Sequence, residues 1–437
     1  MASNAWLPPW SDPAWSVAAA TPIGQLLITQ LKQHEAGDLE TPLPQLTPEL
    51  YSQVHRTGER APFERVYTER RRRLARGVMR LLLEPGLSGG RAVPRPNGRW
   101  WEYVLASIRS LLDEPSWAWP AHVNDPSGVD SGVIDLFAAK TAHLCASLVS
   151  VLGLWLPPAW LEEIRQRVVE GMVVPFVANP SSYGWTKKAN NWNSVCHQGL
   201  LGAALVIDAD TSRLEQLLEI CRTHLERFLD GFTAGGSCLE GITYWEYGFG
   251  WFALLNEQLE QWSAGQESLM AGREARMMAI AAFGPAMLLS RGQLVNFSDS
   301  RLDMPPRASL LRLLGRRLEL PNCEIAGLRL YQQLLTGDLN LDGQRCDLLY
   351  LTRLVLEAPT VGELQHAKEP DVGDWIDPSA QLAVCRRLDG PGRCWELAVK
   401  GGHNGEPHNH NDCGSYLLNV DGQRFAIELV YRPGCKC

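Results

Sequence analysis

Apolar side chains recur at helical spacing along most of the chain, from about Pro48 to residue 317. Spacings of three and four residues between apolar positions are typical of helices that bury one face. The pattern predicts helices over residues 64–84, 99–113, 129–153, 158–173, 190–208, 210–230, 243–263, 267–290 and 306–317. Polar, glycine-rich and aromatic residues gather in the connections between them. Helix pairs whose functional loops gather at one end predict an (α/α) toroid of helical hairpins over residues 46–370.

Two stretches on the N-terminal side depart from this simple pattern. Residues 1–45 are rich in proline and tryptophan and show little periodicity, which predicts an N-terminal arm that packs on the main body. Residues Arg70 to Arg73 form a basic run within the first long helix. A charge run on a helix is usually a solvated face, so we expect these arginines to lie in solvent.

The pattern changes after about residue 370. Short runs of alternating apolar and polar residues, separated by the turn signals DGPG and DGQ, predict about four β-strands in SAQLAVCRRL, RCWELAVKGG, GSYLLNVDGQ and RFAIELVY. We therefore expect an α+β multidomain protein in which residues 371–437 begin an antiparallel β-sandwich domain. A sheet of this size with an open edge is a poor stand-alone unit, so we expect the domain to be incomplete, as in a fragment of a longer protein.

The composition of the chain indicates which kinds of partner and which cellular compartment to expect. A chain of 437 residues with 45% apolar and 21% charged residues is long enough for two or more folded domains. The net charge of −8 argues against a nucleic-acid partner, although a cleft can be locally basic and bind an acidic ligand. No run approaches the ~18 apolar residues of a membrane span. The N-terminus lacks the pattern of a secretory signal. We therefore expect the 11 cysteines of the chain to be reduced thiols of a cytoplasmic protein.

The most polar run of the β region, GGHNGEPHNHND, holds three of the ten histidines. If residues 406–410 are extended, the two-residue period of a strand places Glu406, His408 and His410 on one side. Two imidazoles and a carboxylate on one face suit a metal site or acid/base chemistry. A solvated loop that happens to be rich in histidine is the alternative.

Asparagines open the helical segment NNWNSVCHQGLLGAAL. Asn190 and Asn191 stand at its N-terminal end, directly before Trp192. Asn193 and His197 are four residues apart and share a helix face. Helix N-termini attract anions and asparagine side chains add donors, so the carboxylate of a sugar is a candidate ligand. The alternative is a capping asparagine with a histidine that is satisfied within the core.

The segment GGSCLEGITYWEYGFGWF combines a glycine-rich turn with Glu240 and the tyrosines Tyr244 and Tyr247. The two tyrosines are three residues apart, so one helical face can carry both. A tyrosine hydroxyl can transfer a proton when a neighbouring cation or imidazole lowers its pKa. Structural aromatic residues are the alternative interpretation.

Two further loops carry weaker signals. SWAWPAHVND adds Trp117, Trp119 and His122, which can stack on a sugar ring and hydrogen-bond to it if the loop faces a cleft. VNFSDSR adds Asp299 and Arg301 between helices. Taken alone, each of these loops is better explained by a structural role.

Taken in order, SWAWPAH, NNWNSVCHQG, EGITYWEYGFGWF and GEPHNHNDCGSYLLNVDGQRFAIEL resemble the successive landmarks of the heparinase II/III-like superfamily of polysaccharide lyases, which includes oligoalginate lyases. The resemblance covers about residues 60–437, and HNHND is its most specific element. It implies an (α/α) toroid joined to antiparallel β-sandwich domains, with the active cleft between them. It also implies β-elimination on an acidic oligosaccharide or polysaccharide: a base removes the C5 proton of a uronic acid, and the 4-O-glycosidic bond breaks.

The resemblance assigns roles that the chemistry can explain. Neutralising the carboxylate beside C5 stabilises the enolate-like transition state, and the resemblance gives the carboxylate and proton roles to Asn191 and His197. Tyr244 matches the catalytic tyrosine, with Tyr247 as the second candidate, and His408 matches a catalytic histidine of the β domain. The candidate substrate-binding residues are Trp117, Trp119, His122, Asn190, Trp192, Glu240, Tyr247 and Arg301.

The same resemblance implies a structural zinc ion. His410 matches one of its ligands, and Glu428 takes the place of an acidic ligand that is usually aspartate. A glutamate can ligate zinc, but its extra methylene changes the geometry. The third ligand, a later histidine, would lie beyond residue 437.

Two other classes of function stay open. A glycoside hydrolase on the same scaffold would need two carboxylates beside the cleft, for which Glu240, Glu246 and Asp299 are candidates. The other class is a non-catalytic or degenerate carbohydrate-binding protein. The sequence does not choose between uronic-acid glycans or between exo and endo action, and it does not fix the oligomeric state.

Overall fold

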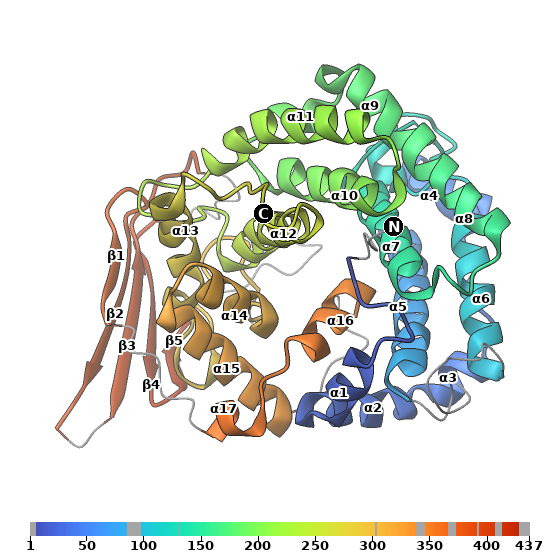
Figure 1. Cartoon of the computed structure of the whole chain (residues 1–437). Coiled ribbons are helices and arrows are strands. Elements are labelled where there is room, and N and C mark those ends of the chain that lie inside the picture. The colour runs from blue at the N-terminus through green and yellow to red at the C-terminus, as the bar shows by residue number, and fades with distance from the viewer. Residues whose placement is uncertain are drawn as a thin grey trace.

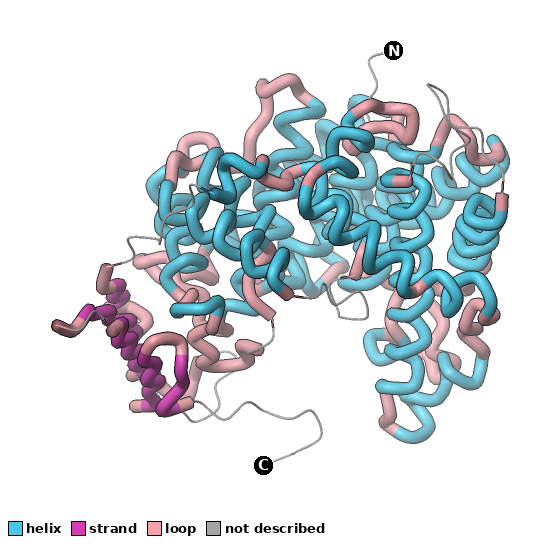
Figure 2. Tube along the Cα trace, turned by 90° about the horizontal axis from the view of Figure 1, so that it is seen from below, coloured by secondary structure: helices cyan, strands magenta, loops and turns pink. Residues whose placement is uncertain are grey.

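The computed structural model describes residues 6–84, 98–130, 132–301, 304–337, 346–365, 373–390, 393–406 and 413–427. Within these ranges a ring of helices is followed by one antiparallel sheet, which lies at the outside of the ring (Figure 1). A second view shows the strands gathered at one end of the helical body (Figure 2). The expected α+β architecture, helices first and antiparallel strands last, is confirmed. None of the described helices is both long and apolar enough to cross a membrane.

The helices and helical turns differ widely in length. They are α1 (Ala14–Ala20), α2 (Pro22–Gln33), α3 (Glu35–Glu40), α4 (Pro48–Thr57), α5 (Ala61–Leu83), α6 (Arg99–Leu112), η1 (Pro120–His122), α7 (Leu136–Leu152), α8 (Pro158–Arg165), η2 (Gln166–Val173), α9 (Val174–Ala178), η3 (Pro180–Ser182), η4 (Gly184–Lys187), α10 (Asn191–Ile207), α11 (Thr211–Leu229), α12 (Ile242–Trp262), α13 (Glu274–Ala286), η5 (Ser290–Gly292), α14 (Ala308–Arg317), α15 (Pro321–Thr336), α16 (Leu348–Leu356) and α17 (Val361–Gln365).

Helices α5, α7, α10, α12, α14 and α16 form the inner wall of the ring. Along this wall, α10 packs between α7 and α12, α14 packs between α12 and α16, and α16 returns to α5 and α7. Helices α6, α11, α13 and α15 lie outside α5, α10, α12 and α14 (Figure 1). This arrangement of an inner and an outer layer is the toroid that the helical pattern predicts.

Contacts between α7, α10 and α12 show that these inner helices run in the same direction. Near their starts, the Ser194 hydroxyl of α10 donates to the carbonyl of Gly248 in α12 (2.8 Å). Nearer their ends, the Gln258 amide of α12 donates to the carbonyl of Gly202 in α10 (2.7 Å) and its oxygen lies 3.1 Å from His143 of α7.

Helices α14 and α16 follow the same direction as α12. Directly before α14, Arg307 lies 3.2 Å from Glu246 in the second turn of α12 and 3.8 Å from Asp347, the N-cap of α16. Farther along, Arg353 of α16 forms an ion pair with Glu257 of α12 (2.7 Å). The N-termini of the inner helices therefore gather at one end of the ring, where their dipoles favour negative charge.

The segment expected to be an arm, residues 1–45, contains helices α1, α2 and α3 within its described part. It packs on the main body, as α1 contacts α16 and α5 while α2 contacts α5 and α15. Trp10 shows why this contact is firm, because its indole N–H donates to the carbonyl of Leu81 in α5 (2.9 Å) and its backbone N–H donates to Val151 of α7 (2.8 Å). The short, proline-interrupted helices explain the weak periodicity of the sequence.

The expectation that the basic run of α5 lies in solvent is wrong. Arg70 and Arg73 are buried, and so is Arg76 one turn later. Arg70 pairs with Glu114 (3.1 Å), while Arg73 and Arg76 both bind the buried carboxylate of Asp38 (3.2 and 2.6 Å). These arginines fasten the N-terminal segment to the ring, because their charges form ion pairs inside the protein.

Acidic and amide side chains set the starts of three inner helices. Asp135 caps α7, Asn190 caps α10 and Asp347 caps α16, each accepting a hydrogen bond from a backbone N–H of the first turn. Between α7 and α10 the backbones approach very closely, since a Cβ added at Gly199 would lie 2.4 Å from the carbonyl oxygen of Ala139. A glycine at this position allows the two helices to pack.

Five strands form a meander in the order β1-β2-β3-β4-β5, with every pair antiparallel. They are β1 (Trp375–Asp377), β2 (Leu382–Leu388), β3 (Cys394–Lys400), β4 (Ser415–Val420) and β5 (Gln423–Ala426). The DGQ signal forms the β4–β5 hairpin, where Asp421 and Gly422 both have positive φ (52° and 76°) as a tight two-residue turn requires. The strands of the described residues make one sheet, with β1 as an addition to the four that the sequence predicts.

The sheet turns its polar face towards the helical ring. The polar side chains on this face are Asp377, Arg386, Glu396, Lys400 and Asn419, of which all but Arg386 are buried, and they alternate with the buried apolar side chains of Val384, Ala398 and Leu417. Arg386 donates to the carbonyl of Ala286 at the end of α13 (2.7 Å), and Glu396 accepts from the backbone N–H of Ser290 (2.9 Å). The opposite face carries exposed apolar side chains, namely Trp395, Leu397, Val399, Tyr416 and Phe425.

Candidate functional site

The candidate site lies at the end of the ring where the inner helices begin. The loop of residues 296–301 is fastened to the start of α12 there. The Ser298 hydroxyl donates to the carbonyl of Leu239 (3.0 Å), and the backbone N–H of Arg301 donates to the Thr243 hydroxyl (2.9 Å). Two of the sequence motifs, EGITYWEYG and VNFSDSR, are thereby brought side by side.

Aromatic side chains from two other motifs meet at the same end. The His122 ring lies 4.8 Å from the Trp192 ring in an edge-on arrangement, and its Nδ1 is 2.6 Å from the carboxylate of Asp135. Trp119 stacks on Phe137 with a centroid distance of 3.5 Å. Trp119, His122 and Trp192 are each only half-buried, so this predicted sugar-binding group keeps an accessible surface.

Trp117 is placed differently from the other aromatic candidates. It is buried, its indole N–H donates to the carbonyl of Leu111 (3.2 Å), and the guanidinium of Arg167 lies over its ring at 4.1 Å. These contacts give Trp117 a place in the core, away from the accessible aromatic group.

The asparagines at the start of α10 include the helix cap. The Asn190 side chain accepts a hydrogen bond from the backbone N–H of Trp192 (3.3 Å), which is the capping role that the sequence analysis gave as an alternative. Asn191 is 8% exposed, so its side chain lies just beneath the surface of this helix end.

His197 is completely buried. Its Nδ1–H donates to the carbonyl of Asn193 (2.7 Å), and its Nε2 accepts from Nδ1–H of His224 (3.2 Å). The ring packs edge-on against Phe176 and Trp185. Burial is the main cause that lowers the pKa of His197 to about 3, so the imidazole is neutral at physiological pH. This geometry is that of the satisfied core histidine, the second alternative of the sequence analysis.

Tyr244 and Tyr247 of α12 both keep accessible surface. Burial, helped by the charges of Asp299 and Glu240, raises the pKa of Tyr244 to about 12. Burial likewise raises the pKa of Tyr247, and the ammonium of Lys140 lies 5.6 Å from the centroid of its ring. Both hydroxyls hold their protons at neutral pH, which suits proton donation to a leaving oxygen better than proton removal.

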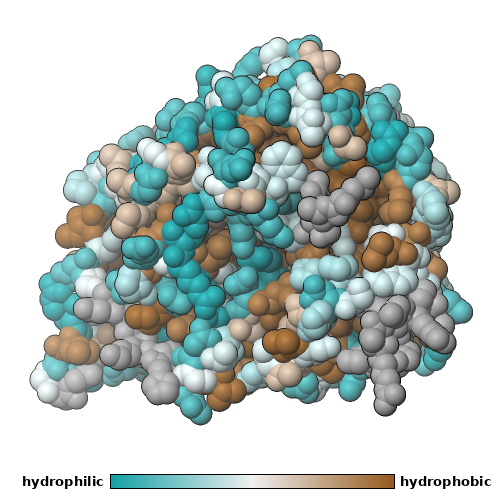
Figure 3. Space-filling view, in the orientation of Figure 1, coloured by the Kyte–Doolittle hydropathy of each residue, from teal (hydrophilic) through white to brown (hydrophobic). Residues whose placement is uncertain are grey.

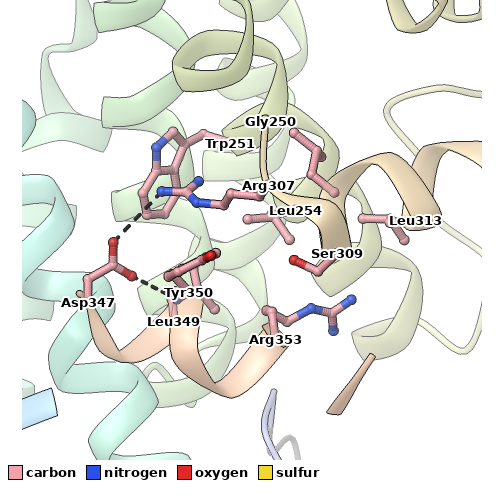
Figure 4. Close-up of a pocket in the computed structure, with 11 residues that line it drawn as sticks. Gly250, Trp251, Leu254, Arg307, Ser309, Leu313, Asp347, Leu349, Tyr350 and Arg353 are labelled. Carbon is pink, nitrogen blue, oxygen red and sulfur yellow. Dashed lines mark hydrogen bonds and ion pairs between the residues drawn. The ribbon is translucent and has the colours of Figure 1, made fainter. Parts of the chain in front are cut away.

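Basic side chains that the sequence analysis did not select line the wall beside these tyrosines. Arg307 extends between the rings of Trp251 and Tyr350, at 5.8 and 5.4 Å, and pairs with Asp347 (Figure 4). These four side chains line one pocket. Figure 3 shows hydrophilic residues gathered over the middle of the ring in the same orientation as Figure 1. The sequence feature that could have indicated Lys140 is its position as a single charge in the otherwise largely apolar helix LFAAKTAHLCASLVSVL.

The polar face of the sheet touches the same region. The ammonium of Lys400 donates to the Ser298 hydroxyl (2.9 Å) and pairs with the carboxylate of Glu406 (3.2 Å). The first residues of the histidine-rich run are thus held beside the loop that contacts α12. Glu406, which the sequence analysis placed on a face with two histidines, is buried in this ion pair.

Three predicted residues, His408, His410 and Glu428, lie outside the described residues. Within the described ranges no three His, Cys, Asp or Glu side chains are grouped so that they could hold a metal ion. Of the other candidates, Glu240 is 9% exposed at the turn before α12, and Arg301 is half-buried.

No protein-family model matches the chain, and no curated protein matches it. The solved structures that are similar to it include the following two. A heparinase III is 13% identical over 91% of this chain and 56% of its own, with a TM-score of 0.47. Heparan sulfate lyase HepC from Pedobacter heparinus is 10% identical over 89% of this chain and 64% of its own, with a TM-score of 0.39. The chain therefore spans less than two thirds of either protein.

Proposed function

We propose that this protein is a polysaccharide lyase that cleaves a uronic-acid glycan by β-elimination at the end of the ring where the inner helices begin. The observation that carries the proposal is the pair of protonated tyrosines on one face of α12, of which Tyr247 lies beside Lys140 and is affected by the charge of Arg307. Elimination needs an acid for the leaving oxygen and positive charge for the uronate, and this wall offers both.

In the proposed reaction the uronate carboxylate binds near the start of α10, where Asn191 and the helix dipole favour an anion. A base takes the C5 proton, the electrons of that bond form the C4–C5 double bond, and the bond from C4 to the bridging oxygen breaks. Tyr244 gives its proton to that oxygen. His408 is the proposed base, and the tyrosinate and imidazolium then exchange the proton through solvent.

The accessible aromatic group gives the sugar chain a place to lie. Trp119, His122 and Trp192 present ring faces and edges of the kind that stack on sugar rings. His197 acts in this proposal as a positioning residue, because its buried ring holds the first turn of α10 through Asn193.

A direct test is a lyase assay of the whole chain on a panel of uronic-acid oligosaccharides, following the absorbance of the unsaturated product. We expect Tyr244→Phe, which removes only the proton donor, to lower kcat by about 10²-fold or more. Tyr416→Phe is the matched control, because Tyr416 is exposed on the far face of the sheet.

Turnover without an unsaturated product would favour the hydrolase alternative, and oligosaccharide binding without turnover would favour a non-catalytic protein. Full activity of Tyr244→Phe would refute the role of this tyrosine.

Zinc remains part of the proposal, with His410 and Glu428 as its candidate ligands. When bound, the ion would be structural and would hold strands of the β domain together. Metal analysis of the purified chain and of His410→Ala tests this: the variant should contain less zinc than the wild type, and equal zinc contents would remove His410 from the ligands.

A further inference from the structure

Lys140 is an unusual feature of the inner wall. It lies in α7, one turn after the helix start, and its side chain is half-buried among the rings of Tyr247 and Trp251, 5.6 Å from each centroid. Among the described residues, no hydrogen bond or ion pair reaches its ammonium. Packing against two rings removes part of the water around this charge, which is unfavourable when no opposite charge replaces it.

Neighbouring cations already have opposite charges beside them. Arg307 lies 3.2 Å from Glu246 and 3.8 Å from Asp347. Arg71, whose Nη2 donates to the Thr141 hydroxyl next to Lys140, pairs with Glu114 at 2.8 Å. Lys140 is therefore the positive charge on this wall that lacks an anion.

The charges around Lys140 bear on whether an anion would bind there. Burial is the main cause that lowers the pKa of Lys140; Asp347, the largest of the charge effects, and Glu246 raise it, and Arg307 and Arg71 lower it. The aligned starts of α7, α12, α14 and α16 add positive potential at this end of the ring. An anion beside Lys140 would be attracted by the cations and the helix starts and would raise the pKa of the lysine.

A pocket adjoins the rings that surround the lysine. Trp251, whose indole faces Lys140, also lines this pocket together with Arg307 and Tyr350 (Figure 4). Aromatic rings and cations in one wall suit a sugar that carries an acidic group, because the rings pack on the sugar and the cations bind its oxygens.

We propose that Lys140 and Arg307 form an oxyanion-binding subsite inside the ring, which takes a second acidic group, a carboxylate or a sulfate ester, of the bound glycan. The assignment of the anion to a glycan rests on the proposed lyase function, whereas anion binding at the subsite does not require catalysis. It would hold the glycan by a group other than the uronate that reacts, and so would favour substrates with closely spaced charges.

Binding of small anions tests the subsite directly. Calorimetric titrations of the whole chain with inorganic sulfate and with glucuronate, in a buffer free of other oxyanions, should show one saturable site for at least one of them. We expect Lys140→Met to weaken this binding by about tenfold or more, since a charge in an enclosed site is lost. Lys187→Met is the matched control because Lys187 is exposed on η4.

The pH dependence adds a readout that a misfolded variant cannot imitate. In the wild type the affinity should fall as the pH rises through the lowered pKa of Lys140, because only the protonated lysine binds the anion. Lys140→Arg, which stays charged, should bind the anion across that range. Sulfate binding alone would indicate a sulfated glycan, and glucuronate binding alone would indicate a uronate in the subsite.

Absence of saturable binding to the wild type, or unchanged affinity in a folded Lys140→Met variant, would overturn the subsite. These outcomes are independent of the lyase assay. If anion binding depends on Lys140 but no elimination product forms, the proposed reaction is wrong and the subsite stands. If elimination occurs and Lys140→Met binds the anion as tightly as the wild type, the subsite is wrong and the reaction stands.

Discussion

At the scale of single residues, burial decides what two histidines of the ring can do. His197 and His143 are 0% and 2% exposed, and burial is the main cause that lowers their pKa values to about 3 and about 4. Both are therefore neutral in the folded protein at pH values where an unfolded chain protonates its histidines.

This difference predicts a pH-dependent stability. As the pH falls below about 6.5, the unfolded chain takes up protons that the folded protein excludes, so the free energy of unfolding should decrease, by up to about 1.4 kcal/mol per pH unit for each histidine. Urea unfolding of the wild type and of His197→Gln at pH 7, 6 and 5 measures it. The variant should lose less stability between pH 7 and pH 5 than the wild type, and equal slopes would show that His197 is not the cause.

Residue identity alone could not separate catalytic from structural candidates. The spacing of Tyr244 and Tyr247 correctly indicated one helical face, since both side chains remain accessible on α12. The i and i+4 spacing of Asn193 and His197 was equally regular, yet both side chains are buried, because the face they share points at α11. Periodicity shows which residues lie together, and the neighbouring helix decides whether they meet solvent.

At the scale of elements, the long amphipathic helices were predictable and the short ones were not. The predicted segment 99–113 corresponds to α6 and 243–263 to α12, within one or two residues. By contrast, α16 is a nine-residue apolar run, LLYLTRLVL, which gives no helical period, and its start depends on the cap Asp347. Lys140 and Arg307 meet only because α7 and α14 belong to one closed ring, which no local pattern reveals.

The contact between α7 and α10 provides a test of this helix packing. Gly199→Ala places a Cβ 2.4 Å from the carbonyl oxygen of Ala139, which is too close, so we expect a loss of about 1–3 kcal/mol in the free energy of unfolding. Gly171→Ala is the matched control, because its Cβ would meet only an ordinary contact at 3.6 Å and alanine has the higher helix propensity. Chemical denaturation of both variants measures the difference, and equal stabilities would contradict the tight contact.

At the scale of the whole molecule, the sheet is oriented with its polar side towards the ring and its apolar side outwards. Apolar side chains of neighbouring strands are paired across this outer face, as in exposed Leu397 with half-buried Leu418 and in Val399 with Tyr416, which are both exposed. A contiguous apolar surface of this kind favours association with other molecules. The alternation in the sequence predicted the strands, but it could not show which face turns to the helices.

Charge substitutions on the two faces should therefore have opposite effects. Val399→Lys adds a charge to the outer face, and we expect lower binding of a hydrophobic dye and less self-association, with stability changed by about 0.5 kcal/mol or less. Ala398→Lys, one residue earlier, would bury an unpaired ammonium against the ring and should unfold the sheet. Dye fluorescence and light scattering of the two variants check the prediction, and equal dye binding by Val399→Lys and wild type would contradict it.

The buried arginines of α5 also conceal a set of protease sites. Trypsin cleaves after arginine, yet Arg70, Arg73, Arg76 and Arg80 are enclosed by the N-terminal segment that they fasten. In the native protein these peptide bonds should survive while an exposed site such as Arg393 is cut. Fragments that end between residues 70 and 80 would therefore report that the N-terminal segment separates from the ring, and their detection needs no spectroscopic label on the protein.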